Sequence, residues 1–591
     1  MFGNGNKDVK KSTSLTGLAK GIFGGNKSNN GATEGDTKQE PATAPVTPAT
    51  SEAPGFKAGD LIRPDRLAKE AKNAVYALKP DAVDWIDWKG FPYHSIRFKN
   101  DVDRILQRKQ HDVNQFNETK NTALHVVVGG GDKELVLSIL AAGAELELQD
   151  SEGNTPLHIA AKKNSVSVTQ ALLGFGADVN VRNNNGDTPR HLAATSQTKK
   201  KDRILFVLHA VGAERCEAGK EGCTDGCRQD GTFDGAPPDV PISERARSVL
   251  DFYPEAELLN PSNRGGRVLC LDGGGIKGVV LIAQLMALER LTQRPPLECF
   301  DWIAGTSTGG ILASGLAAGK PLRELMNTYF LIKDKVFGIT RPFDDRELLK
   351  ILKEILGEHT VMNDIQSVKL LITGTLCDKS PVRLHLFRNY ASPSSMVAPD
   401  APPERTPPLA DHTQQVVWQA ARSSGAAPTY FEKFDRFMDG GLIANNPTLD
   451  TLTEIHERNL ALKRVGRSDE VTELSVVVSL GCGMSPVQDL DVDIVWPDDP
   501  LEFANNVLGI VKILNILSSQ TTNPDNAVVD RARAWCSMIN VPYYRFSPTL
   551  HQDVDLATKD DKVLATILWE TRAYMYQRYG DVKTCAQLLA Q

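Results

Sequence analysis

Two short apolar runs near the middle of the chain, residues 267–271 and 300–304, have the length and hydrophobicity of buried β-strands. Each is followed by a glycine-rich turn and then by a longer stretch of small and apolar residues, at 279–291 and 310–318, which is typical of a packed helix. The two strand–turn–helix units are expected in one domain, and their turns are the candidate sites for its chemistry.

A different pattern, with a period of 33 residues, precedes this domain. The tetrapeptide Thr-Ala-Leu-His begins at Thr122, Thr-Pro-Leu-His begins at Thr155, and Thr-Pro-Arg-His begins at Thr188. The pairs Gly143-Ala144 and Gly176-Ala177 keep the same spacing. This period and signature are those of ankyrin repeats, so the three phased copies predict an all-α solenoid over residues 116–215.

The last repeat departs from the pattern. Gly212 and Ala213 follow a lysine-rich insertion at 199–201 and predict the end of a fourth unit. Arg190 stands where the motif has an apolar residue, which predicts a weaker or capping repeat. The histidines of the motif are expected to satisfy local backbone groups and not to bind a ligand.

The turn after residues 300–304 contains Gly305-Thr306-Ser307-Thr308-Gly309, the G-x-S-x-G pattern. At a sharp strand-to-helix turn of this kind the serine is strained and its hydroxyl is exposed at the helix N-terminus. Gly305 and Gly309 are expected to form the elbow, because side chains there would clash with the neighbouring strand and helix. The pattern predicts Ser307 as a nucleophile.

The glycine-rich turn after residues 267–271 allows two interpretations. Its G-x-G-x-x-G spacing between a strand and a helix is the context of a dinucleotide-binding loop, whose acid would be Asp301. However, Asp301 opens a strand instead of closing one. The alternative is an oxyanion hole, in which the N–H groups of successive glycines point at one spot beside a helix N-terminus. We favour it because a serine nucleophile needs such donors, and we assign it to Gly273, Gly274, Gly275 and Gly278.

Asp439, in Asp439-Gly440-Gly441, is the candidate base. A triad would need a histidine, but His456 stands in a polar helical stretch that is expected to face solvent, and His551 stands in a loop. The other histidines considered stand in no motif: His359, His385 and His412. A Ser307–Asp439 pair, in which Asp439 takes the serine proton directly, is the simpler prediction.

The order D-G-G-G-x-x-G, G-x-S-x-G, D-G-G resembles the patatin-like phospholipase family over residues 265–450, and residues 422–428 resemble the family's stretch ahead of the catalytic aspartate. The resemblance implies a modified α/β-hydrolase domain with three layers. It also implies that Ser307 and Asp439 form a catalytic dyad and that the glycines of residues 273–278 form the oxyanion loop.

Ankyrin repeats followed by such a domain resemble the group VI (beta-type) calcium-independent phospholipases A2, as do residues 530–536, 543–546 and 568–571. The resemblance implies a serine esterase that hydrolyses the sn-2 fatty acyl ester of glycerophospholipids, and also lysophospholipids, through an acyl-serine. The expected partners are a phospholipid membrane surface, a protein bound by the repeats, calmodulin at 531–546 and a second copy in a homodimer. The rival functions are an ankyrin scaffold with an inactive hydrolase fold and a nucleotide-regulated binding protein.

The length allows several domains, and the scattered cysteines favour the cytoplasm. The resemblance implies peripheral association with membranes, including the mitochondrial surface. A net charge of −7 argues against nucleic acid as a partner. The start lacks the apolar core of a signal peptide, and no apolar run is long enough to span a membrane. The expected parts are a disordered stretch (1–58), a lead-in or divergent repeat (59–115), ankyrin repeats (116–215), a linker (216–260), a catalytic core (261–450) and its C-terminal part (451–591).

The sequence predicts no metal and no cofactor, with ATP as a candidate regulator only. The nine cysteines have scattered spacing, which is typical of reduced thiols, and Cys216, Cys223 and Cys227 lack the two close pairs of most zinc sites. Asp489, Asp491 and Asp493 begin like a calcium loop, but its sixth and twelfth positions hold Ile494 and Pro500. The apolar residues 508–517 are expected in the core, at an oligomer contact or at a membrane interface.

Overall fold

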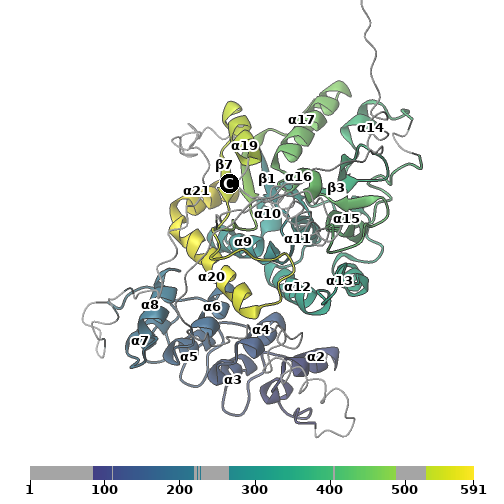
Figure 1. Ribbon diagram of the computed structural model, residues 1–591. Helices are drawn as coiled ribbons and strands as arrows, with labels where there is room; N and C mark the ends of the chain where they lie inside the picture. The colour runs from purple at the N-terminus through teal and green to yellow at the C-terminus, as the bar shows by residue number, and fades with distance from the viewer. Residues whose placement is uncertain are drawn as a thin grey trace, which may run out of the picture. The chain divides into compact units, whose positions relative to one another are not determined.

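The computed structural model describes residues 84–108, 111–217, 223, 227, 230, 265–402, 406–486 and 527–591 (Figure 1). The expected low-complexity N-terminus, most of the linker, the acidic residues 489–493 and the apolar residues 508–517 lie outside these ranges. Residues 84–591 form one compact unit, which holds both the repeats and the α/β domain.

Three helix pairs follow the 33-residue period. They are α3 (Ala123–Gly130) with α4 (Lys133–Ala141), α5 (Pro156–Lys162) with α6 (Val166–Gly174), and α7 (Pro189–Ala194) with α8 (Lys201–His209). Thr122, Thr155 and Thr188 are the N-caps of the first helix of each pair. Gly212 lies directly after α8, so Gly212-Ala213 closes the third pair and not a fourth unit, because the lysine-rich insertion lengthened the third repeat.

The lead-in contains a divergent repeat before these three. A short helix η1 (Pro92–Ser95) precedes α2 (Lys99–Arg108). His94 Nε2 lies 2.8 Å from the carbonyl oxygen of Asn121, which begins the next repeat. His125 and His158 make the equivalent contacts, at 3.0 Å, to the carbonyls of Asn154 and Asp187. Each histidine therefore ties its own repeat to the backbone of the following one, as the structural interpretation predicted.

The α/β domain is built on a mixed sheet in the order β4-β3-β2-β1-β6-β7, with β5 paired to β3. Strands β3, β2, β1, β6 and β7 run parallel to one another, whereas β4 and β5 run antiparallel to β3. The strands are β1 (Gly266–Leu271), β2 (Trp302–Gly305), β3 (Lys369–Leu376), β4 (Arg383–Arg388), β5 (Phe437–Asp439), β6 (Leu474–Leu480) and β7 (Tyr543–Phe546).

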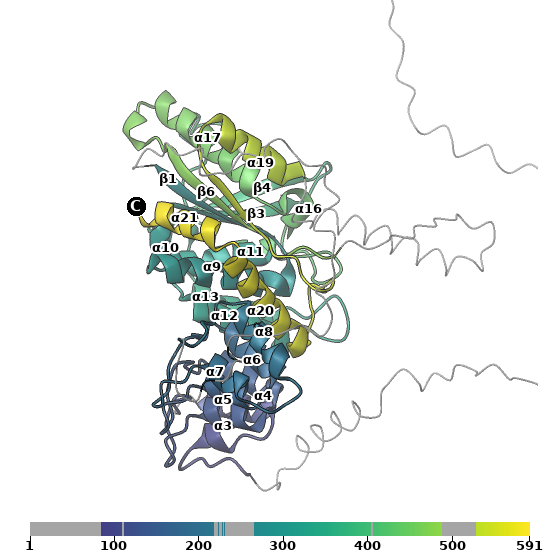
Figure 2. The ribbon, with the colours of Figure 1, turned by 90° about the vertical axis from the view of Figure 1, so that its left-hand side faces the viewer.

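Helices cover both faces of this sheet, which gives the predicted three layers. Along β1, Val268 and Cys270 belong to one buried cluster and Leu269 and Leu271 to another, because successive side chains of a strand point to opposite faces. In Figure 2, α17 (Thr448–Arg464) and α19 (Ala527–Met538) lie on one face. The other face carries α9 (Gly278–Thr292), α11 (Thr308–Ala317) and α21 (Tyr579–Ala590).

The remaining helices surround this framework. They are η5 (Gly275–Lys277), α10 (Pro296–Cys299), α12 (Leu322–Lys335), α13 (Arg346–Leu356), η6 (Met362–Asp364), α14 (Pro393–Val397), α15 (Val417–Ser424), α16 (Gly441–Ala444), η7 (Ser468–Glu470) and α20 (Asp561–Gln577). Helix α20 packs against α6 of the repeats. Arg572 Nη1 donates to the Leu173 carbonyl of α6 (2.8 Å), and Trp569 Nε1 donates to the Val207 carbonyl of α8 (3.0 Å).

The segment expected to bind calmodulin is folded into the domain. Its first part is helix α19, in which Val529, Ala532 and Cys536 are buried, and its last part is the sheet strand β7. The segment is therefore not a continuous helix that a partner could enclose, and calmodulin binding stays a prediction. None of the helices in the described part of the chain is long and apolar enough to cross a membrane.

Candidate active site

Ser307 lies at a tight elbow between β2 and α11. Its backbone has φ 53° and ψ −120°, a region that non-glycine residues avoid and that costs roughly 1–3 kcal/mol when the surroundings impose it. A β-carbon at Gly305 would collide with the carbonyl of Gly309, and one at Gly309 would collide with the carbonyl of Leu271. Both glycines are therefore required by the closeness of strand and helix, as the sequence pattern predicted.

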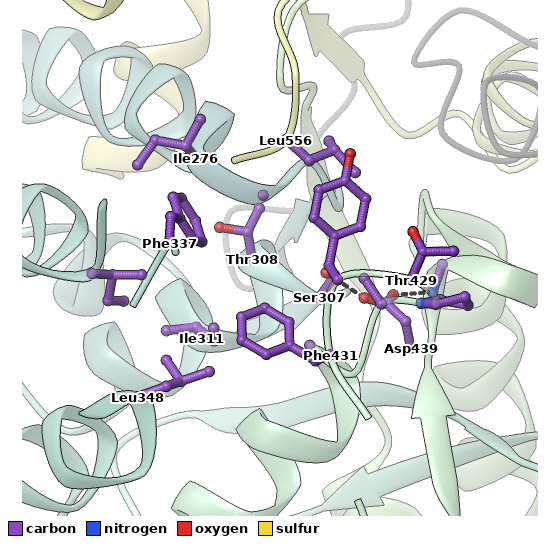
Figure 3. Close-up of a pocket in the computed structure, with 18 of the residues that line it drawn as sticks. Ile276, Ser307, Thr308, Ile311, Phe337, Leu348, Thr429, Phe431, Asp439 and Leu556 are labelled. Carbon is purple, nitrogen blue, oxygen red and sulfur yellow. Dashed lines mark hydrogen bonds between the residues drawn. The ribbon is translucent and has the colours of Figure 1, made fainter. Parts of the chain in front are cut away.

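The Ser307 hydroxyl donates a hydrogen bond to Asp439, with 2.7 Å between Oγ and Oδ2 (Figure 3). The two residues are 132 positions apart, and the sheet brings them together. Asp439 ends β5, which pairs with β3, and β3 is the neighbour of the strand that leads into Ser307. The chain thus places the predicted nucleophile and the predicted base in direct contact.

Asp439 is held in one orientation and is almost fully buried. Its second carboxylate oxygen, Oδ1, accepts from the N–H of Gly441 at 2.7 Å. Its backbone carbonyl accepts from Thr375 Oγ1 at 2.8 Å. Burial raises the pKa of the Asp439 carboxyl to about 6, although the Ser307 hydroxyl, the Gly441 N–H and the charge of Arg422 each act to lower it. A carboxylate with a pKa near neutrality is suited to accept a proton during turnover.

No histidine of the described residues bonds to this pair. The hydrogen bonds of the two side chains join Ser307 to Asp439 and Asp439 to Gly441. His456 is exposed on α17, and His551 lies beside Glu570, with 3.1 Å between Nδ1 and Oε2. His385 is packed against the rings of Phe387 and Phe437. Ser307 and Asp439 thus form a two-residue pair with no histidine bonded to it among the described residues, and their catalytic roles stay a prediction.

The glycine loop between β1 and α9 lies beside Ser307. Some of its N–H groups donate to an acceptor within the protein, and others do not. Gly273 donates to the carbonyl of Asn445 at 3.1 Å, and Gly278 donates to that of Gly275. The N–H groups of Gly274 and Gly275 donate to no acceptor among the described residues, and both residues line the same pocket as Ser307. Two of the four predicted glycines therefore have N–H groups available for a ligand.

The other two glycines allow close packing. A β-carbon at Gly273 would meet the side chain of Asn445 and lie 3.2 Å from Ser307 Cβ. At Gly278 it would collide with Tyr329 and Thr308. These contacts let the loop approach the nucleophile closely.

The position of Asp301, the acid that a dinucleotide site would need, argues against the dinucleotide interpretation of this loop. Asp301 precedes β2 and binds Arg267 near the start of β1, with 2.8 Å between the Arg267 N and Oδ2. The glycines follow the opposite end of β1. In a dinucleotide site the acid and the glycines stand together at the carboxyl ends of the strands.

A pocket of about 410 Å³ opens beside the dyad. In Figure 3, Ile276, Ile311, Phe337 and Leu348 lie to one side of Ser307, and Asp439 and Thr429 lie to the other. Except for the dyad and the glycine loop, the wall near Ser307 is largely aliphatic and aromatic. Such a wall accepts an apolar chain whose reactive carbon reaches Ser307.

The sequence patterns indicated no individual role for two residues of the site, Ser424 and Arg422. Ser424 Oγ accepts the N–H of Ser307 at 2.7 Å and so fixes the elbow. Arg422, on the same helix α15, is buried and binds Asp345, with 3.0 Å between Nη2 and Oδ2. Its charge also acts on Asp439. Both belong to residues 422–428, and their proximity to the predicted family motifs was the signal that could have identified them.

Comparison with known proteins agrees with the two parts of the fold. Residues 269–452 match the patatin-like phospholipase family, and residues 94–183 and 124–215 match ankyrin repeats in three copies. The chain therefore carries a patatin-like domain after ankyrin repeats, as predicted. The first ankyrin match, residues 94–183, begins within the divergent repeat at η1.

Curated proteins that are similar to this chain include three named phospholipase A2. It is 46% identical over 324 residues to the 85/88 kDa calcium-independent phospholipase A2 of Rattus norvegicus, covering 54% of this chain and 40% of the rat protein. Identity to the Mus musculus protein of the same name is 44% over 352 residues, covering 59% of this chain and 43% of that protein. Identity to the intracellular phospholipase A2 of Caenorhabditis elegans is 34% over 392 residues, covering 64% and 35%. The chain thus spans less than half the length of these relatives.

Proposed function

We propose that this chain, with its patatin-like domain and ankyrin repeats, is a calcium-independent phospholipase A2 that hydrolyses the sn-2 fatty acyl ester of glycerophospholipids. The observation that carries the proposal is the 2.7 Å hydrogen bond from Ser307 Oγ to the buried Asp439 carboxylate, at the wall of an apolar pocket. The similarity to proteins named phospholipase A2 supports it.

The proposed reaction uses the chain's own groups in two steps. Asp439 accepts the proton of Ser307 as Oγ attacks the ester carbonyl carbon, and the N–H groups of Gly274 and Gly275 bind the oxygen that becomes negative. Collapse of this intermediate breaks the bond to the glycerol oxygen, which leaves with the proton from Asp439. In the second step Asp439 takes a proton from water as the water attacks acyl-Ser307. The bond from the acyl carbon to Ser307 Oγ then breaks, Oγ regains its proton from Asp439, and the fatty acid is released.

The shape of the pocket supports a lipid acyl chain as the group that Ser307 receives. Its apolar wall runs from the dyad past Ile311 to Phe337 and Leu348. Burial of a methylene group contributes about 0.8 kcal/mol, so a long acyl chain gains most of its binding energy there. We propose that this wall binds the acyl chain and not the headgroup, which would allow lysophospholipids as additional substrates.

A lipid pool tests this proposal. We expect the purified chain, in excess chelator, to release free fatty acid and 1-acyl lysophospholipid from vesicles of mixed phospholipids, as resolved by mass spectrometry. The chelator is included because backbone N–H groups, rather than a metal, are proposed to stabilise the oxyanion. Absence of hydrolysis would favour the scaffold with an inactive fold. Hydrolysis that returns only when calcium is added would contradict the calcium-independent assignment.

The pH dependence follows from the raised pKa of Asp439. The carboxyl must be ionised to accept the Ser307 proton, so activity should be full above its pKa of about 6 and be lost as the pH falls through that value. We expect kcat/KM to fall about tenfold for each pH unit below that midpoint. The measurement is the hydrolysis of a soluble short-chain ester, with circular dichroism to confirm folding at each pH. A flat profile across the midpoint would contradict Asp439 as the base.

Exposed aliphatic side chains beside the pocket suggest how the site meets a membrane. Ile339 is fully exposed between the pocket residues Phe337 and Arg341, and Ile443 is 45% exposed on α16, directly after the pocket residue Leu442. Inserting one such side chain into lipid gains roughly 1.5–3 kcal/mol. We therefore propose that these two residues contact the bilayer during turnover.

Substitution by aspartate tests this contact. Ile339→Asp and Ile443→Asp should each reduce hydrolysis of phospholipid vesicles by roughly tenfold or more, because the apolar contact is lost. Hydrolysis of a soluble ester should be unchanged, because neither residue lines the pocket. The matched control is Leu460→Asp, a 52% exposed leucine on α17. Equal losses with both substrates, or an equal loss in the control, would contradict the assignment.

The expected setting of this activity is the cytoplasm, with peripheral attachment to membranes that include the mitochondrial surface. The ankyrin repeats suggest a protein partner. A homodimer, calmodulin binding and regulation by ATP are retained as proposals that follow from the family resemblance. The nucleotide-binding alternative has less support, since the position of Asp301 removes its acid from the glycine loop.

A further inference from the structure

The last ankyrin histidine differs from its three predecessors. His94, His125 and His158 each turn Nε2 toward a carbonyl 27 to 29 residues further along, in the next repeat. His191 instead has Nδ1 3.2 Å from the sulfur of Cys216. Its Nε2 lies 3.4 Å from Oδ1 of Asp187. The histidine of the final repeat has thus been turned toward a sulfur atom.

Two more cysteines lie at the same place. Cys227 Sγ is 3.2 Å from Cys216 Sγ, and Cys223 completes the group. The four ligand atoms of His191, Cys216, Cys223 and Cys227 all lie within 4.8 Å of one another. Cys227 and His191 are buried, and the other two are half-buried. The cysteines form no disulfide in this structure.

These distances suit a tetrahedral zinc ion. Zn–S bonds of about 2.3 Å place two sulfur ligands about 3.8 Å apart, so the four atoms need to move by only fractions of an ångström to become ligands. Three thiolates and one imidazole form one of the usual ligand sets of closed, structural zinc sites. A zinc-binding histidine commonly donates its other ring N–H to a carboxylate, which is the position that Asp187 has.

We propose that His191, Cys216, Cys223 and Cys227 bind a structural zinc ion at the end of the ankyrin array. The sequence spacing predicted no metal, because the cysteines do not form two close pairs. That expectation could not include His191, which the helix α7 brings to the cluster from 25 residues upstream of Cys216.

The zinc site would stabilise the end of the ankyrin array. A repeat array needs a cap at its end, because the last repeat has no following neighbour to cover it. Here the described residues Cys216, Cys223, Cys227 and Asp230, which follow α8, lie at that end of the array. The buried Arg190 donates to the carbonyls of Cys227 and Ala213, both at 3.2 Å, and to Asp230 Oδ1 at 3.0 Å. Arg190, which departs from the repeat motif, thus holds Cys227 and Asp230 beside α7, and zinc would link Cys227 to His191 by coordination.

The metal content of the full chain tests the proposal. After expression with added zinc and gel filtration, we expect about one zinc per chain by mass spectrometry of the metal. In Cys216→Ser/Cys223→Ser the zinc content should fall at least tenfold. Two matched controls should retain it: Cys377→Ser, at a half-buried cysteine outside the cluster, and His158→Asn, at the equivalent position of the preceding repeat.

Cobalt provides a readout that does not depend on variant folding. Wild-type chain loaded with Co²⁺ should show the intense visible bands of a tetrahedral site and a thiolate-to-cobalt charge-transfer band. The proposal is overturned if wild-type chain binds neither zinc nor cobalt, if the double variant keeps its zinc, or if His158→Asn loses as much zinc as the double variant. Iron in place of zinc, or a disulfide between Cys216 and Cys227 in the metal-free chain, would also overturn it.

Discussion

Ser307→Ala and Asp439→Asn are each expected to abolish phospholipid hydrolysis while leaving the chain folded. Alanine removes the attacking oxygen. Asparagine keeps the shape of Asp439 and can still accept the 2.7 Å hydrogen bond, but it cannot take the serine proton. Loss of the nucleophile or base of a serine hydrolase costs roughly 10⁴- to 10⁶-fold in kcat. The measurement is fatty acid release from vesicles at saturating substrate, with thermal unfolding as the check on folding.

The histidine variants are the controls for this experiment. His456→Ala and His551→Ala remove an exposed ring on α17 and a ring beside Glu570, and neither contacts the dyad. Both should retain wild-type turnover within about twofold, as expected for surface substitutions away from the site. If either histidine variant is as inactive as Ser307→Ala, the enzyme uses a triad and the dyad mechanism is wrong.

The parts of the fold that the sequence predicted are those with a local signature. The repeats were recognisable because Thr122, Thr155 and Thr188 cap helices in the same phase. The elbow was recognisable because Gly305 and Gly309 have no room for a side chain. The three-layer arrangement followed from the resemblance, and the alternate burial along β1 confirms it.

The parts that the sequence could not predict depend on contacts between distant segments. Gly212 was assigned to a fourth repeat because the insertion before α8 lengthens the third repeat. From the sequence alone, the helix that precedes Gly212 could therefore not be assigned to the third repeat. The N–H of Gly273 donates to Asn445, which is 172 residues away, so the sequence could not show that this N–H is not available to a ligand. His191 could not be assigned to the cysteines because it occupies the same motif position as His125 and His158, where a structural role is expected. In each case the missing information was a tertiary partner.

Gly275→Ala should lower turnover by roughly 100- to 1,000-fold, the effect of losing about 3–4 kcal/mol of oxyanion stabilisation. Gly275 has φ +58°, and an added β-carbon would press on the backbone carbonyl of Leu556. That carbonyl accepts the N–H of Ile276 at 2.8 Å, so the loop cannot shift without moving its own anchor. The displaced N–H groups of Gly274 and Gly275 would then miss the oxyanion. Because the charge develops only during reaction, kcat should fall much more than apparent substrate affinity.

The matched control for this variant is Gly319→Ala. Gly319 has a similar left-handed backbone, φ +75°, but nothing lies within 4 Å of an added β-carbon. It therefore carries the same backbone strain, of order 1 kcal/mol, at a distance from the site, and its kcat should be unchanged. Steady-state hydrolysis of vesicles and of a soluble ester at saturating substrate distinguishes the outcomes. If Gly275→Ala keeps near wild-type kcat with both substrates, the loop does not bind the oxyanion. Loss of protection by ATP against heat in that variant, with hydrolysis intact, would instead assign the loop to a nucleotide.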